Sequence, residues 1–223
     1  MIFITGMHRS GTSLVAQVLY NLGLEFGNPK DFIKKDNWNS NGYLENKNFI
    51  NLNNKIILGN QLSEDYIQKN VSKFFPRLVN NLMSKKWKYL FFPNQNELKS
   101  NFKTIYANKE FDFIERKKEL FVKDPRFCLT IRFWQSIYDI DYIFFAFRNP
   151  LSVASSIYKR DGLPKFIGLK LWEYHIKTFF ENVKDGTKIK LINFDNFSQE
   201  STYSLEINKI QKSCKIFNIK NTI

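Results

Sequence analysis

The stretch from Gly6 to Ser13 has the residue types and spacing of a phosphate-binding loop. It reads Gly-Met-His-Arg-Ser-Gly-Thr-Ser, with four residues between the two glycines. In such a loop the backbone N–H groups and the positive end of the following helix bind an anion. We therefore expect the ligand to be held by the residues of this loop other than Met7, which are Gly6, His8, Arg9, Ser10, Gly11, Thr12 and Ser13.

The loop lacks the lysine of a nucleotide triphosphatase. That lysine directly follows the second glycine, where this chain has Thr12, and Arg9 is the only cation in the loop. A glycine turn that only joins a strand to a helix is the alternative. The residue types favour a phosphate site built on Arg9.

A second set of candidate phosphate ligands follows the apolar run Tyr142–Phe147. Arg148-Asn149-Pro150 comes directly after it, and Ser156 lies eight residues after Arg148. Proline suits the first turn of a helix, which leaves Arg148 at the end of a strand and Ser156 on the helix behind it. Both side chains can then reach one phosphate group.

These segments resemble the nucleotide-binding motifs of sulfotransferases that use 3′-phosphoadenosine 5′-phosphosulfate (PAPS). The segment Arg9–Ser13 is similar to the family's 5′-phosphosulfate loop, and Arg148 with Ser156 is similar to its 3′-phosphate site. Phe194 stands where many members have a tyrosine beside the adenine. A phenylalanine ring can still stack on the adenine, but it lacks the hydroxyl through which a tyrosine would make a further contact.

Two further segments extend the resemblance. Lys123-Asp124-Pro125-Arg126 is similar to a Lys-Asp-Pro segment of bacterial and tyrosylprotein members, and Gly42-Tyr43-Leu44-Glu45 is similar to a segment whose carboxylate acts as base. The resemblance implies that Arg9 and Lys123 neutralise the phosphosulfate while Glu45 takes the acceptor's proton. A charge at the start of a helix is the alternative role for Glu45.

Three other residues are candidates for the base. His8 lies within the phosphate loop, and His175 falls in the helical stretch around Leu169–Phe180, where a half-buried structural role is expected. Asp124, between Lys123 and Arg126, would be ion-paired and a weak base. Asp124, Arg126 and Arg160 are also candidates for acceptor binding, although the two arginines can equally pair with Asp124 and Asp161.

The elements that would position these residues alternate between strands and helices. Strands are predicted at Ile2–Thr5, Leu120–Val122, Tyr142–Phe147 and Ile189–Ile192, each followed by a turn and a helical pattern. Such an alternation predicts an α/β fold with a parallel sheet flanked by helices. The resemblance implies the sulfotransferase variant of the P-loop NTPase fold.

One domain is expected over residues 1–223, with a helical insertion at about 25–118 after the first strand and helix. Apolar residues recur at helical spacing within it and predict helices at Glu45–Leu58, Ser63–Lys85 and Glu97–Lys118.

The composition narrows the class of protein. Hydrophobic residues make up 43% of the chain and aromatic residues 17%, which excludes a disordered chain. The formal charge is +13, but 27 of the 34 basic residues are lysines spread over every segment, as on a solvated surface. The two cysteines show no spacing of a metal site. No membrane-spanning run or signal peptide is recognised, so the cytoplasm is the expected location.

The function expected from these features is sulfuryl transfer. PAPS is the expected donor and 3′,5′-bisphosphoadenosine (PAP) the product, with no metal required. The expected acceptor is a small molecule or glycan, with the sulfuryl group passing to a hydroxyl of a glycan or other carbohydrate-containing molecule. A P-loop kinase or nucleotidase is the main alternative, and the missing loop lysine argues against it. A nucleic-acid-binding protein is weakly suggested by the charge but has no recognisable reading module.

Overall fold

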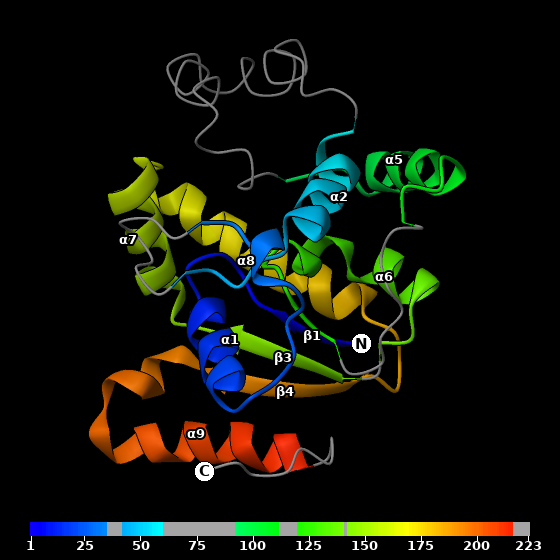
Figure 1. Cartoon of the computed structure of the whole chain (residues 1–223). Coiled ribbons are helices and arrows are strands. Elements are labelled where there is room, and N and C mark those ends of the chain that lie inside the picture. Colours follow the sequence, from blue (N-terminus) through cyan, green and yellow to red (C-terminus); the bar gives the residue numbers. More distant parts are fainter. Residues whose placement is uncertain (35–41, 60–91, 112–119, 141, 216–223) are drawn as a thin grey trace.

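A four-stranded parallel sheet forms the centre of the protein (Figure 1). The computed structural model describes residues 1–34, 42–59, 92–111, 120–140 and 142–215. The strands are β1 (Ile2–Thr5), β2 (Phe121–Lys123), β3 (Tyr142–Phe147) and β4 (Lys188–Asn193), in the order β2-β1-β3-β4. The predicted α/β class and parallel sheet are confirmed. Every predicted strand is present, and its ends lie within one residue of those expected.

Helices cover both faces of the sheet (Figure 1). One face carries α1 (Thr12–Asn21) and α9 (Glu200–Lys215). The other carries α2 (Lys47–Leu58), α5 (Gln95–Ala107), α6 (Phe127–Ile137) and α8 (Lys165–Asn182). Helix α7 (Pro150–Asp161) packs against α8, and two short 3-10 helices are η1 (Pro29–Asp31) and η2 (Phe194–Ser198).

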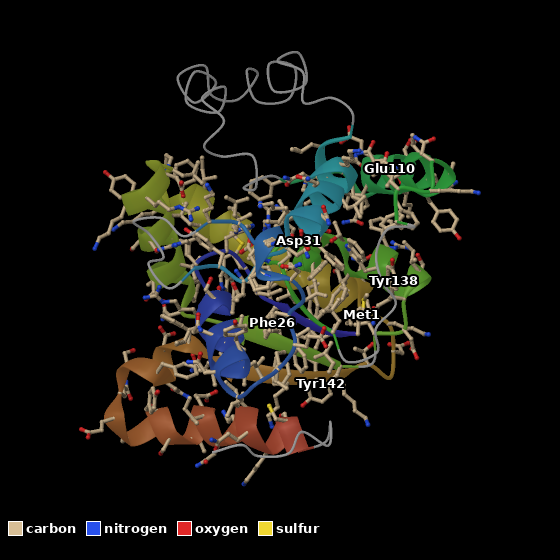
Figure 2. The ribbon with its side chains drawn as sticks, viewed as in Figure 1. Met1, Phe26, Asp31, Glu110, Tyr138 and Tyr142 are labelled. Carbon is tan, nitrogen blue, oxygen red and sulfur yellow. The ribbon has the colours of Figure 1, made fainter. Side chains whose placement is uncertain are left out.

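The strands send alternate side chains into two apolar cores because successive residues of a strand point to opposite faces. Phe3 and Phe145 face the α6 side and pack with Phe127 and Trp134. The opposite core includes Ile2, Ile4, Phe144, Leu19 and Ile210. Figure 2 shows side chains filling the space between the sheet and its helices, with Tyr138 and Met1 in the first core and Phe26 and Tyr142 in the second.

Helix α2 begins two residues later than predicted. The side chain of Asn46 accepts a hydrogen bond from the backbone N–H of Asn48, and asparagine is among the strongest N-terminal caps. The helix therefore starts at Lys47. Glu45 lies before it in extended chain, where its carbonyl accepts from the N–H of Ile33 at 2.9 Å.

Helix α5 ends at Ala107, so its predicted continuation to Lys118 is wrong as far as the structure describes it. Lys109 has a φ of 55°, and Glu110 N–H donates to the Ile105 carbonyl at 3.2 Å. This is the hydrogen bond of a Schellman motif, which ends a helix and usually has glycine where this chain has lysine. The helix predicted at Ser63–Lys85 and the segment 112–119 lie outside the described residues.

The strand order locates a crevice at one edge of the sheet. The chain passes from β1 to β2 on one side, and then crosses to β3 on the other side of β1. In open parallel sheets, ligands bind at the carboxyl ends of the strands where the order reverses in this way. The loops that follow β1 and β3 carry the two predicted phosphate-binding segments.

Candidate functional site

Close packing of β1 on β3 requires glycine at the start of the phosphate loop. Gly6 has a φ of 144°, and a β-carbon there would lie 2.0 Å from the carbonyl oxygen of Ala146. The loop then turns back through a hydrogen bond from Ser10 N–H to the Met7 carbonyl at 3.0 Å. Helix α1 begins at Thr12, so the loop ends at a helix N-terminus as predicted.

Arg9 joins the phosphate loop to the segment after β3. Its Nε donates to Ser156 Oγ at 2.9 Å, and Arg148 Nη1 donates to its carbonyl at 3.4 Å. Its backbone has a φ of 69°, a conformation that non-glycine residues rarely adopt and that is concentrated at functional sites. The structure therefore brings together the two predicted phosphate-binding segments.

Arg9 forms no ion pair with any carboxylate in the part of the chain that the structure describes. Burial, followed by the nearby Arg160, lowers its pKa from the ordinary value of arginine. A partly buried guanidinium beside a second cation is stabilised when an anion binds between or near them. Arg9 is therefore suited to an anionic ligand.

Arg148 lies on the ring of Phe194, with its Cζ 4.7 Å from the ring centroid. Its Nε is 3.5 Å from Asp195 Oδ1. Phe194 in turn packs on the phosphate loop, because a β-carbon at Gly11 would lie 1.9 Å from its ring. Of the residues expected to hold the nucleotide, Arg148, Ser156 and Phe194 thus all lie beside the loop.

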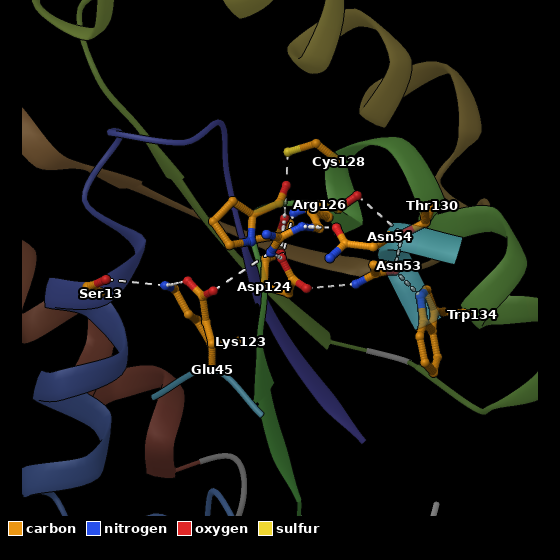
Figure 3. Close-up of polar contacts among 12 residues, drawn as sticks. Ser13, Glu45, Asn53, Asn54, Lys123, Asp124, Arg126, Cys128, Thr130 and Trp134 are labelled. Carbon is orange, nitrogen blue, oxygen red and sulfur yellow. Dashed lines mark hydrogen bonds and ion pairs between the residues drawn. The ribbon is translucent and has the colours of Figure 1, made fainter. Parts of the chain in front are cut away.

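A second group of charges follows β2 and is buried (Figure 3). The Lys123 Nζ donates to the Glu45 carboxylate and, at 3.2 Å, to Ser13 Oγ. It also lies 5.7 Å from the centre of the Tyr43 ring. Lys123 and Glu45 are 1% and 6% exposed, so this pair is almost fully removed from water. The structure brings Glu45 to the same edge of the sheet as the phosphate loop, through Lys123.

Asp124 and Arg126 extend this buried group (Figure 3). Asp124 Oδ1 accepts from the backbone N–H and the Nη1 of Arg126, both at 2.9 Å. Arg126 Nη1 is 3.7 Å from Glu45 Oε2, and its Nε donates to Asn54 Oδ1 at 2.9 Å. Burial by itself would lower the pKa of Arg126, but Asp124 and Glu45 raise it. The predicted pairing of Arg126 with Asp124 is confirmed.

Asn53 anchors this group, and the sequence analysis did not assign it a role. Its Nδ2 donates to Asp124 Oδ2 at 2.9 Å, while its Oδ1 accepts from Thr130 Oγ1 and Trp134 Nε1, both at 2.7 Å. The signal was present in the sequence, since Asn53 lies four residues after Phe49 on the apolar face of α2. A polar residue on such a face needs partners.

Two histidines are buried near these cations with their rings 6.4 Å apart. Burial lowers the pKa of His8 well below its ordinary value, and Arg126, His175, Arg160 and Lys123 lower it further. Burial also lowers the pKa of His175 to about 4, although its Nδ1 lies 2.8 Å from the Leu171 carbonyl. His175 is fully buried, not half-buried as expected. Both rings are neutral at pH 7.

Arg160 pairs with its neighbour in sequence. Its Nε lies 2.9 Å from Asp161 Oδ2 and 3.1 Å from Asp161 Oδ1, so the pairing considered from the sequence is present. Arg160 lies close enough to Arg9 and His8 to lower the pKa of both. It therefore contributes positive charge to the same region.

The described ranges lack both a cluster of metal ligands and a membrane-spanning helix. Within them, no three His, Cys, Asp or Glu side chains are arranged to hold a metal ion. No helix in these ranges combines the length and the apolar character needed to cross a bilayer.

Comparison of the chain with profiles of known protein families, with curated proteins and with solved structures found no match.

Proposed function

We propose that this protein is a PAPS-dependent sulfotransferase with the sulfotransferase variant of the P-loop fold. The observation that carries the proposal is the contact between the two phosphate-binding segments, in which Arg9 donates to Ser156 and Arg148 donates to the carbonyl of Arg9. A nucleotide with phosphates at both its 5′ and 3′ positions fits two adjacent anion sites of this kind. A nucleoside triphosphate would need only the anion site in the loop after β1.

In the proposed reaction, an acceptor oxygen attacks the sulfur, and the bond between sulfur and the 5′-phosphate oxygen breaks. Negative charge grows on the departing phosphate, so the loop amides, Arg9 and Lys123 would stabilise the transition state. The acceptor's proton passes to a base, for which we propose Glu45 once Lys123 has turned from this carboxylate to the phosphosulfate. PAP and the sulfated acceptor are the products.

The position of Lys123 favours this reaction over a kinase reaction. In a P-loop kinase the hydroxyl that matches Ser13 binds magnesium. Here an ammonium group donates to that hydroxyl at 3.2 Å. Lys123 thus supplies positive charge at the point where a kinase holds its metal, which supports transfer without a metal ion.

For the acceptor, we propose a hydroxyl of a glycan or other carbohydrate-containing molecule, bound near Asp124, Arg126 and Arg160. We also propose that the protein acts in the cytoplasm. Cys128 and Cys214 are both buried free thiols, and burial raises their pKa to about 12 and about 11. Inert reduced cysteines are typical of cytosolic proteins.

Calorimetry with PAP and with adenosine 5′-phosphate, in excess chelator, tests the proposal. PAP should bind more tightly by about 1.5 to 3 kcal/mol, because one charge-assisted contact involves the 3′-phosphate. Arg148→Ala should remove most of that difference. Equal affinity for both nucleotides, or nucleotide binding and turnover of ATP that require magnesium, would reject the proposal.

The substitution Glu45→Gln tests the base. A positioned carboxylate contributes about 10² to 10⁴ in rate, so sulfuryl transfer should fall by that factor while PAP affinity stays nearly unchanged. Because Gln also leaves Lys123 without its carboxylate, rates must be compared at a temperature where the variant is folded. Near-normal turnover would transfer the role to His8 or Asp124.

A further inference from the structure

The guanidinium proposed to bind the 3′-phosphate already has an anion beside it. Asp195 Oδ1 lies 3.5 Å from Arg148 Nε, and the two side chains are 37% and 27% exposed. At this exposure an ion pair contributes little to stability. The Arg148 Nε itself is buried and makes no hydrogen bond with any described residue, so a ligand can reach only the exposed part of the guanidinium. Asp195 therefore occupies a position at which it can compete with a bound phosphate.

Asp195 is fixed in that position by several other contacts. Its second carboxylate oxygen accepts from the backbone N–H of Asn149 at 2.7 Å. Its own N–H donates to the side chain of Asn193 at 3.1 Å, and its carbonyl accepts from Ser198 Oγ at 2.7 Å. These bonds link the turn after β4 to the turn after β3, so the carboxylate stays near Arg148 whether or not the ion pair is intact.

The rest of Arg148 is positioned to receive a ligand. The guanidinium lies on Phe194 and its Nη1 donates to the Arg9 carbonyl, while Nη2 makes no hydrogen bond within the described residues. Arginine offers five N–H donors. A phosphate at this site would therefore find free donors on Arg148, but at a short distance from the charge of Asp195.

We infer that Asp195 weakens binding of the ligand's 3′-phosphate by competing, as a fixed carboxylate, for Arg148, and so limits the preference of the site for PAP over adenosine 5′-phosphate. This inference rests on the proposed function. A 3′-phosphate carries up to two negative charges and three acceptor oxygens, so it can bind Arg148 beside the fixed carboxylate, but the charge of Asp195 repels it. A 3′-hydroxyl is neutral, so the charge of Asp195 affects its binding much less.

The substitution Asp195→Asn removes the charge and keeps an oxygen that can accept from Asn149. By calorimetry, PAP should bind about fivefold more tightly to this variant, the equivalent of about 1 kcal/mol for a surface charge pair. The affinity for adenosine 5′-phosphate should change less than about twofold. The gain for PAP should shrink in 1 M salt, where charges interact over only about 3 Å.

Asp185→Asn is the matched control. It removes the same charge from an exposed residue before β4, at the opposite edge of the sheet, and should leave both affinities unchanged. Asp195→Ala also loses the acceptor for Asn149 and should show a smaller gain for PAP than Asp195→Asn. This order of the two variants separates the charge of Asp195 from its hydrogen bond.

Two kinds of failure are distinguishable. If the wild-type protein prefers PAP but Asp195→Asn leaves that preference unchanged or weakens PAP binding, the inference is wrong and the proposed function stands. If the wild-type protein binds PAP and adenosine 5′-phosphate equally, both are wrong.

Discussion

The two groups of charges at the carboxyl edge of the sheet differ in how completely their members are satisfied. In the buried group, Lys123, Glu45 and Asp124 are at most 6% exposed, and every carboxylate has a cation and a hydrogen-bond donor. In the rim group, the side chains of Arg148 and Asp195 are 27% and 37% exposed and share one ion pair at 3.5 Å.

The difference indicates on which group the stability of the fold depends more strongly. A buried ion pair persists only if its partners and hydrogen bonds compensate for lost hydration, so removing one member is costly. A rim pair costs little to open. The buried group thus pre-positions Lys123 and Glu45, while the ion pair at the rim can open at little cost to the fold.

The largest expected effect comes from breaking the buried group. Lys123→Met leaves Glu45 without its closest cation and should lower the free energy of unfolding by about 3 to 5 kcal/mol, measured by urea denaturation. Lys170→Met, which breaks an exposed pair with Glu173, is the control and should cost less than about 0.5 kcal/mol.

Adding Glu45→Gln to Lys123→Met should recover part of the loss, because the uncompensated carboxylate is then gone. A loss below about 1 kcal/mol in the single variant would mean that water reaches Glu45, and the contrast between the two groups would not hold.

The next effect concerns Arg9, a partly buried cation that forms no ion pair among the described residues. Arg9→Ala should reduce sulfuryl transfer by about 10²-fold, as for one preorganised donor to a transition state, with a small change in unfolding free energy. Sulfuryl transfer is measured with a labelled donor. Arg132→Ala, which loses a contact to Asn182 on α8, is the control.

Ser156→Ala sharpens the same test, since Arg9 and Ser156 share a hydrogen bond. The double variant should lose less PAP affinity than the sum of the two single losses, with a coupling of about 0.5 kcal/mol or more. Additive losses would show that the two phosphate sites act independently.

The last effect is the dependence of stability on pH. The pKa of His175 is about 4 in the folded protein and about 6.5 in the unfolded chain, so the unfolded chain binds more protons between these values. Stability should therefore fall as the pH drops, by about 2 kcal/mol between pH 7 and pH 5 from this residue alone.

The measurement compares urea denaturation of the wild-type protein and of His175→Gln at both pH values. The variant should lose about 2 kcal/mol less between them. An equal loss in both proteins would show that His175 is accessible to water or protonated in the folded state.

The sequence predicted local features better than contacts between distant segments. The strand ends were correct within a residue, because apolar runs bounded by glycine and polar turns are local signals. The start of α2 and the end of α5 were missed for a local reason as well. Asn46 caps the start of α2. Lys109 follows the end of α5 in the left-handed conformation, a position that a glycine usually marks in a sequence.

The sequence predicted which residues lie near one another at this edge of the sheet better than it predicted their contacts. Arg9, Arg148 and Ser156 were expected to bind phosphates, but the bond between Arg9 and Ser156 was not expected. The roles of Asn53 and Asp195 were also missed. Asn53 contacts Asp124 across 71 residues of chain, and Asp195 contacts Asn149 across 46. No spacing rule covers such pairs.

The sequence by itself determined the alternation of strands and helices, the glycine-bounded loop and the absence of its lysine, because each depends on neighbouring residues. The tertiary structure alone decided which charges share a partner. The Glu45–Lys123 pair joins residues 78 apart, and it forms because the chain before α2 crosses the edge of the sheet where β2 ends. Burial then makes the Glu45–Lys123 pair costly to break, whereas the Arg148–Asp195 pair at the rim is not. The free-energy cost of an unpaired charge depends on the water around it and not on its residue type.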